Sequence, residues 1–345
     1  MAHAVRFSDV EASSISDSLG PLASTKDGIL RYVADHALTG DLRRRSEYFM
    51  RLLTEVPDAT DWDKDSLYYW ANYESPYIGF GQGDFPVGGY RRLVASIGAG
   101  ADVRLGHRVT QVVSDAHGVR VRGSDDKGRR FEFKGSHVVV TIPLGALKSG
   151  AIWFSPALPA SKRGAIARLG FGVFEKVVMR FPEPYWASGH THIFHLSHPT
   201  PMRFPLIVDY FHLEKIPVIV AFNTGRHARA LGILSDRAIA ARMIATLRAV
   251  QGGPIPAPTS VVVTRWHRDP FTRGAYSFIP VGSSPADQET LARPVAGRVL
   301  FAGEATSTTR FGYADGALSS GIREAKRLLR SGTVELRASP SAASR

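Results

Sequence analysis

VLFAGEATSTTRFGYADGALSSGIREAKRLL, residues 299–329, joins an apolar strand to a regular helix through a Gly-Glu turn and a loop. Asp315 falls in the first turn of the expected helix and basic residues fall in its last turn, so both ends suit the helix dipole. The unpaired N–H groups near residues 313–316 could hold an anionic or electron-rich ligand group. This pattern predicts a helix terminus that faces a cofactor.

The expected helix is amphipathic, because small and apolar residues recur at steps of three and four. We expect this face in the core: Ala314, Ala317, Leu318, Gly321, Ile322, Ala325, Leu328 and Leu329. We expect the charged face in water: Arg323, Glu324, Lys326, Arg327 and Arg330.

Composition indicates a soluble globular protein with two intertwined domains. The 345 residues are 44% apolar, without a run long enough to span a membrane. Cysteine is absent, which excludes disulfides, thiolate metal sites and cysteine nucleophiles. That absence is consistent with a reducing compartment, and no signal peptide is readable in the first 20 residues. We therefore expect a cytoplasmic protein.

The net charge of +12 raises the question of a polyanionic partner. Lys and Arg are spread along the chain, and the short clusters at 43–45 and 129–130 are typical of solvated faces. We expect neither a nucleic acid nor a membrane as partner.

The order of elements alternates between helical and β patterns. Residues 26–60 are predicted to be helical, with this buried stripe: Ile29, Val33, Leu38, Leu42, Phe49, Leu52 and Leu53. A short helix is expected over Tyr90–Ile97, and alternation with turns over about 109–135 predicts a β-meander. His137–Pro143 is continuously apolar and predicts a strand buried on both faces. A further helix is expected near 235–250.

Several catalytic patterns are absent. The chain contains neither a Gly-x-Ser-x-Gly elbow nor a Walker A sequence. His190, His192, His195 and His198 form a cluster without an accompanying carboxylate, and their spacing is not an established ligand pattern. We predict no metal site.

Four segments resemble, in order and spacing, the C-terminal two-thirds of the FAD-dependent amine oxidases. They are VVVTIPLGALKSGAIWFSPALP (138–159), RLGFGVFEKVVMRF (168–181), VTRWHRDPFTRGAYSFIPVG (263–282) and LFAGEATSTTRFGYADGALSSGIREAKRLL (300–329). The resemblance covers approximately residues 80–330 and is greatest to polyamine oxidases and lysine-specific histone demethylases.

The resemblance implies a mixed α/β fold, in which an incomplete Rossmann-like FAD domain adjoins a substrate domain. The expected divisions are a helical part of the substrate domain (1–78), an FAD-domain segment with the meander (79–150), a substrate domain on a mixed sheet (151–265), a second FAD-domain segment (266–332) and a disordered tail (333–345).

By match of position, seven residues are expected to contact FAD. They are Val112, Trp266, Gly303, Glu304, Gly312, Tyr313 and Ala314. Gly303 and Glu304 would contact the ribityl and pyrophosphate portion, and Ala314 would donate its N–H to the flavin pyrimidine. A helix N-terminus there favours the negative charge of the reduced flavin. Val112 would meet the adenine through its backbone, although an ordinary strand valine explains it equally well.

Lys176 is the residue to which the resemblance assigns chemistry, since the matching lysine holds a water near flavin N5. The alternative is a surface lysine with a buried stem. In a strand, Phe174 and Lys176 share a face and Glu175 points away. Tyr276 and Tyr313 would flank the flavin as an aromatic cage for the amine, with core packing as the alternative.

The implied reaction is hydride transfer from the amine α-carbon to flavin N5, followed by imine hydrolysis and reoxidation by O2 to H2O2. The family opens with a Gly-x-Gly-x-x-Gly turn, and no such sequence occurs in these 345 residues. Three explanations stay open: a fragment, a partner chain that supplies the nucleotide-binding half, or a decayed protein that acts only in binding or structure.

Overall fold

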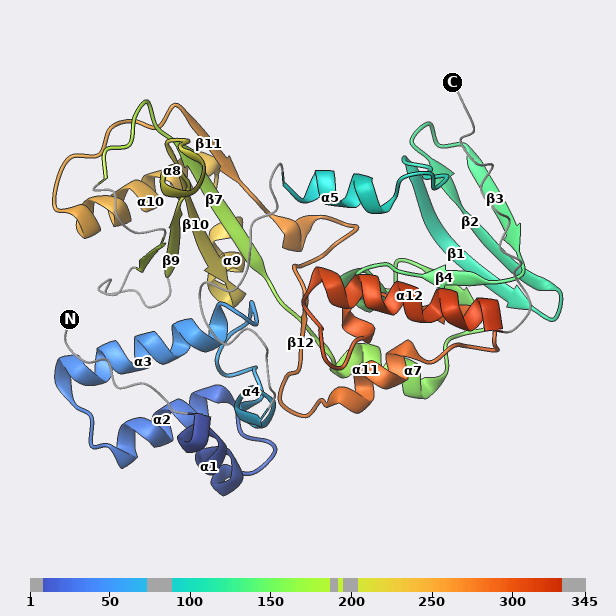
Figure 1. Cartoon of the computed structure of the whole chain (residues 1–345), viewed down its shortest axis with the longest axis horizontal. Coiled ribbons are helices and arrows are strands. Elements are labelled where there is room, and N and C mark those ends of the chain that lie inside the picture. The colour runs from blue at the N-terminus through green and yellow to red at the C-terminus, as the bar shows by residue number, and fades with distance from the viewer. Residues whose placement is uncertain (1–8, 73–88, 187–191, 195–203, 331–345) are drawn as a thin grey trace, which may run out of the picture.

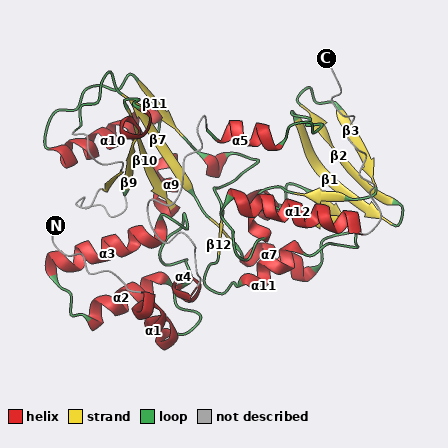
Figure 2. Ribbon diagram, viewed as in Figure 1, coloured by secondary structure: helices red, strands yellow, loops and turns green. Residues whose placement is uncertain are grey.

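The computed structural model describes residues 9–72, 89–186, 192–194 and 204–330 and has a mixed α/β fold with several sheets, as expected (Figure 1). Figure 2 shows helices and strands on both sides of the molecule. One side holds the N-terminal helices and a five-stranded sheet, and the other holds the meander and the helices α7 (Ala160–Arg168), α11 (Pro285–Ala292) and α12 (Ala314–Arg330). No described helix has the length and apolarity that a bilayer crossing demands.

The N-terminal helices form a small cluster of their own. Their bounds are α1 (Asp9–Leu19), α2 (Thr25–Asp35), α3 (Gly40–Glu55) and α4 (Leu67–Asn72). A capping box between Ser24 and Asp27 starts α2. Of the predicted buried stripe, these side chains are buried: Ile29, Val33, Leu38 and Leu52. Phe49 and Leu53 are half-buried. Leu42 was predicted wrongly: it is 43% exposed, because the first turn of α3 extends beyond the cluster.

The larger sheet has the strand order β11-β7-β10-β9-β8. Its strands are β7 (Phe174–Arg180), β8 (His192–Phe194), β9 (Leu206–Asp209), β10 (Val218–Thr224) and β11 (Ser260–Val263). Every described pairing in it is antiparallel, so its described part is not the mixed sheet that we expected. Short connections such as α8 (Tyr210–Glu214) join neighbouring strands and favour that direction.

Helices cover both faces of this sheet. On one face Val177 and Met179 pack against α10 (Asp236–Gln251), which confirms the helix expected near 235–250, and α9 (Gly225–Gly232) lies beside it. On the other face, the apolar side chains of β9 and β10 pack against Leu52 and Val56 from the N-terminal cluster. The C-terminal half of α3 and its end therefore share a core with the sheet, next to the cluster that the N-terminal helices form among themselves.

The meander is confirmed as β1 (His107–Asp115), β2 (Gly118–Asp125) and β3 (Arg130–Gly135), with β5 (Trp153–Ser155) parallel to β1. The remaining elements are α5 (Tyr90–Ile97), β4 (Val138–Val140), α6 (Leu144–Lys148), α7 (Ala160–Arg168), β6 (Gly170–Phe171), η1 (Trp266–Arg268), β12 (Ser277–Phe278), α11 (Pro285–Ala292), β13 (Val299–Phe301), η2 (Glu304–Thr306) and α12 (Ala314–Arg330). The predicted helix 90–97 is thus confirmed.

The strand expected over His137–Pro143 is shorter than predicted. Only 138–140 form β4, which pairs in parallel with β13. Val140 is buried, whereas Val138 and Val139 are half-buried, so the predicted burial on both faces is wrong for most of β4. The physical reason is that only β13 flanks β4 in the described two-stranded sheet. The side chains of β4 therefore lack the neighbours that a strand on its other edge would supply.

The orientation predicted for the final helix is also wrong. The buried residues of α12 are Gly316, Ser320 and Glu324. Leu318, Ile322 and Leu329, expected in the core, are 45%, 46% and 39% exposed.

Polar bonds explain this orientation. Ser320 Oγ accepts the Gly303 N–H at 2.8 Å, and the Arg323 guanidinium donates to the Phe301 carbonyl at 2.9 Å. Glu324 accepts from Arg323 and Arg327. The helix is therefore fixed to the strand and turn before it through its polar side, and its apolar stripe faces outward.

Two glycines of α12 provide a matched test of this packing. A Cβ on Gly316 would lie 1.9 Å from the Arg310 carbonyl oxygen, whereas a Cβ on Gly321 would meet nothing within 4 Å. We expect Gly316→Ala to destabilise the protein by about 1–3 kcal/mol through overpacking. Gly321→Ala should be neutral or stabilise it by about 0.5–1 kcal/mol through helix propensity. Urea unfolding measures both, and equal free energies of unfolding for the two variants would contradict the packing.

Lys162, in the first turn of α7, is a buried cation, only 2% exposed, and its ammonium lies against the C-terminal end of α11. Its Nζ donates to the carbonyls of Thr290 and Leu291 at 3.0 and 2.5 Å and lies 4.0 Å from the Phe301 ring centroid. Burial lowers the pKa of Lys162 to about 8, although the charge of Glu324 opposes that shift. This lysine therefore loses its proton in the folded protein before it does so in the unfolded chain.

Stability should accordingly rise with pH between the folded pKa, about 8, and the usual lysine pKa of 10.5. In that window the unfolded chain binds one more proton than the folded protein. The free energy of unfolding should therefore increase by about 3 kcal/mol across the whole window. Lys162→Met should remove this slope, and the exposed Lys326→Met should keep it. The measurement is urea unfolding at several pH values, and parallel curves for all three proteins would refute the linkage.

Candidate active site

Lys176 lies in the middle of β7, opposite Phe222 of β10. Its Nζ is 5.9 Å from the ring centroids of both Phe174 and Phe222. The side chain is half-buried, and burial lowers the pKa of Lys176 while the charge of Glu175 opposes the shift. The alternation predicted for this strand holds, because Lys176 and Phe174 share a face. A lysine in such surroundings is more easily deprotonated than one in water.

Aromatic rings surround this lysine. Phe174 stacks on Phe222 with centroids 4.9 Å apart, and it meets Tyr276 at 6.1 Å. The Tyr276 hydroxyl donates to the Val56 carbonyl at 3.2 Å, and burial raises the pKa of Tyr276. The structure thus brings together Lys176, Phe174 and Tyr276. Sequence reasoning missed Phe222, although its place in an apolar strand, VIVAF, was a signal.

The turn before α12 holds the other predicted residues. The Glu304 carboxylate accepts from Ser277 Oγ at 2.6 Å, from Ser277 N at 3.1 Å and from Gly312 N at 2.6 Å. Burial raises the pKa of Glu304. Gly312 has φ +77°, and a Cβ there would come within 3.4 Å of the Tyr276 ring. Glu304 therefore anchors the loop beside Tyr276, and its contact with a cofactor stays a prediction.

Tyr313 and Ala314 lie at the start of α12, and both are exposed. The Arg310 guanidinium is 4.9 Å from the Tyr313 ring centroid and donates to Asp315 at 2.6 Å. Gly303 has φ +124°, a conformation that favours glycine. Figure 1 shows the N-terminal end of α12 turned toward β7 and β11.

Trp266 and Val112 differ in surroundings. Trp266, in η1, is 44% exposed. Val112 is buried and pairs with Val121 on one side and Phe154 on the other. Its environment is that of an ordinary strand valine, and its contact with adenine stays a prediction.

Acidic residues beside Tyr276 were not singled out from the sequence, although the run DATDWDKD over 58–65 was a signal. Burial raises the pKa of Asp58 to about 7. Burial together with the nearby charges of Asp58 and Glu55 raises the pKa of Asp65. Asp65 Oδ2 is buried without a hydrogen-bond partner. The charge of Asp58 in turn contributes to the raised pKa of Tyr276.

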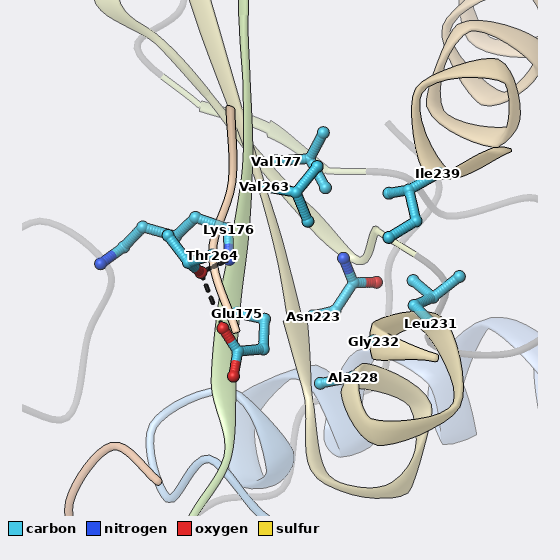
Figure 3. A pocket seen from close by; sticks show the side chains of 10 residues that line it. All are labelled: Glu175, Lys176, Val177, Asn223, Ala228, Leu231, Gly232, Ile239, Val263 and Thr264. Carbon is cyan, nitrogen blue, oxygen red and sulfur yellow. Dashed lines mark hydrogen bonds between the residues drawn. The ribbon is translucent and has the colours of Figure 1, made fainter. Parts of the chain in front are cut away.

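A small cavity lies on the opposite side of β7, with room for roughly one water molecule. Figure 3 shows the Lys176 side chain pointing away from it, whereas Val177 and Leu231 border it. This cavity is therefore too small, and on the wrong side of β7, to receive a ligand beside the Lys176 ammonium. Most of the histidine cluster, His190, His195 and His198, lies outside the described residues.

The residues present fit the ring system of a flavin. Trp266 and Tyr313 expose aromatic surface, the exposed Ala314 begins α12, and Lys176 is half-buried with a lowered pKa. An electron-rich heterocycle suits such donors and aromatic walls.

Comparison with known proteins identifies relatives over most of the chain. Residues 22–329 match the family described as flavin containing amine oxidoreductase. The lysine-specific histone demethylase 1 homolog 1 of Oryza sativa subsp. japonica is 36% identical over 77% of this chain and 31% of its own length. The peroxisomal N(1)-acetyl-spermine/spermidine oxidase of Homo sapiens is 38% identical over 57% of this chain and 43% of its own. The chain thus spans less than half the length of these two curated relatives.

A solved structure shares the fold. Wild-type putrescine oxidase bound to putrescine superposes with a TM-score of 0.73, covering 93% of this chain and 74% of that chain at 18% identity. The chain therefore belongs to the flavin containing amine oxidoreductase family, whose cofactor is FAD.

Proposed function

We propose that this chain forms the amine-facing part of an oxidase that converts a primary or secondary amine to an imine, with O2 reduced to H2O2. The observation that supports the proposal is the placement of Lys176 among Phe174, Phe222 and Tyr276, beside the loop that leads into α12.

The residues of the chain have distinct roles in this proposal. FAD, when bound, supplies the hydride acceptor. The aromatic walls exclude water and favour the neutral amine, which is the form that can give up a hydride. Lys176, with its lowered pKa, holds a water and exchanges a proton at Nζ. Glu304 keeps Gly312 and Tyr313 in place.

A small monoamine or polyamine is the substrate class that we favour. The net charge of +12 disfavours a polycation, but the surroundings of Tyr276 are not basic throughout, since Asp58 is close enough to contribute to its raised pKa. The relatives' names include a spermine and spermidine oxidase and a putrescine oxidase, which supports this choice.

We further propose that additional polypeptide, from a longer product or a partner chain, completes the FAD site. The apolar stripe of α12 is exposed, as is that of α5, where Tyr90, Val94 and Ile97 are 58%, 64% and 57% exposed. Parallel sheets are normally covered on both faces, whereas β4 is only half-buried.

A catalytically inactive remnant that acts in binding or structure is the second candidate, and the same exposed apolar surface favours it. Amine-dependent peroxide release separates the two. The chain joined to a nucleotide-binding half should release H2O2 with spermidine or benzylamine, and a flavin-loaded assembly that is inert toward all amines would favour the remnant. An in-frame Gly-x-Gly-x-x-Gly upstream of Met1 would identify that half.

A further inference from the structure

Glu175 is a buried carboxylate, 5% exposed, that follows Phe174 and precedes Lys176 on β7. Its side chain projects from the strand in a different direction from that of Lys176 (Figure 3). One oxygen, Oε2, accepts from Thr264 Oγ1 at 2.7 Å and from Trp266 N at 3.0 Å. The other, Oε1, accepts from His267 N at 3.0 Å and from His267 Nδ1 at 2.8 Å. Four donors on the segment after β11 thus converge on one side chain.

Thr264 connects this carboxylate to the backbone of Lys176. The ladder between β7 and β11 ends at the pair Val177 and Val263. Beyond it, Thr264 Oγ1 accepts the Lys176 N–H at 2.8 Å, and the Thr264 N–H donates to the Lys176 carbonyl at 3.0 Å. The Thr264 hydroxyl therefore accepts the Lys176 N–H in place of a backbone carbonyl of the strand, and it donates a hydrogen bond to the Glu175 carboxylate.

The segment is also held from its other side. A Cβ on Gly232 would lie 2.5 Å from His267 Cε1, so only glycine allows the imidazole to pack there. Arg265 donates to the carbonyls of Gly232 and Leu234 at 3.0 and 2.8 Å. The turn that carries Trp266 is thus fixed between β7 and the end of α9.

We infer that Glu175 is a positioning residue that sets Trp266 at a fixed place relative to Lys176. Lys176 lies on β7 in the site described above, and Trp266 lies on the segment that follows the last strand pair of β7 and β11, Val177 and Val263. The kinetic consequence rests on the proposed function, whereas the placement of Trp266 does not.

The test replaces Glu175 by Gln in the full chain labelled with 5-fluorotryptophan. Trp266→Phe assigns the Trp266 signal among the five tryptophans. Glutamine keeps the shape but presents an NH2 group to donors, so the 19F resonance of Trp266 should shift or broaden while the other four stay in place. Glu132→Gln, on the exposed strand β3, is the matched control and should change none of them. An unmoved Trp266 signal in a folded Glu175→Gln protein overturns the inference.

Thr264 provides a second, milder test. Thr264→Ser keeps the hydroxyl and should preserve the 19F signal of Trp266. Thr264→Val removes the hydroxyl and should shift that signal. Identical spectra for the two variants overturn the inference even if Glu175→Gln does not fold.

Kinetics supply a separate measurement in the complete, flavin-loaded enzyme. Glu175→Gln should slow flavin reduction by roughly 10- to 100-fold, because small misplacements of positioned groups have effects of that size, while KM changes by less than about twofold. An unchanged rate with a shifted Trp266 signal overturns the link to Lys176. A wild-type enzyme without amine-dependent reduction refutes the proposed function, and the 19F spectra still decide whether Glu175 places Trp266.

Discussion

The purified chain by itself is expected to be colourless and to release no peroxide with spermidine, benzylamine or amino acids. Its described residues offer aromatic walls and a helix N-terminus for the flavin ring, while the apolar stripe of α12 is exposed and two of the three residues of β4 are only half-buried. Without the nucleotide-binding half, the contacts with FAD are too few to offset the free energy that ordering the cofactor costs. We therefore expect most of the affinity for FAD to be lost. The measurements are the visible absorbance of the protein after gel filtration with FAD and a coupled peroxide assay.

A yellow preparation that keeps its flavin through gel filtration would contradict this prediction, because it would show that the chain binds FAD unaided. Supplying the nucleotide-binding half, fused or co-expressed, should restore the colour. The variant Ile322→Glu places a charge on the stripe and should block that restoration, whereas Lys326→Glu on the same helix should not.

Lys176→Met is expected to slow flavin reduction or reoxidation by roughly 100-fold or more in the completed enzyme, the range typical of a lost proton-transfer group. Methionine keeps the length of the stem between Phe174 and Phe222, so the loss reports on Nζ and not on packing. The exposed Lys134→Met on β3 is the control. Stopped-flow absorbance of the flavin measures each half-reaction, and unchanged rates in both would remove Lys176 from the mechanism.

The pH dependence follows from the direction of the Lys176 shift. Burial lowers the pKa of this ammonium below its usual value, so the neutral amine forms at lower pH than for a lysine in water. If neutral Nζ takes up the proton, the rate should rise with pH through that lowered pKa. Lys176→Met should lose this limb of the profile, and a limb that persists in the variant belongs to another group.

Local patterns predicted well the elements whose partners are close in sequence. The meander, the helix Tyr90–Ile97 and the helix α10 match their expected ranges, because hairpin turns and caps such as Ser235 are local signals. The shared face of Phe174 and Lys176 also follows from strand geometry alone.

The partners of the site came only from the folded structure. Phe222 lies 46 residues after Lys176 and meets it through the register of β10 on β7. Glu175 finds its donors about 90 residues away, on a segment with no pattern that points to it. Periodicity cannot report such pairings, because it describes one element at a time.

The sequence by itself determined the family and the flavin, since four motifs in order carry that information. The tertiary structure decided which face of the final helix is buried. Periodicity placed Leu318 and Ile322 inward, yet polar bonds from Ser320 and Arg323 to the preceding strand and turn hold them outward. Amphipathicity shows that a helix has an apolar face, and only the neighbouring chain determines what that face meets. Within 299–329 the strand β13 is therefore buried, whereas α12 turns its apolar stripe away from the described core.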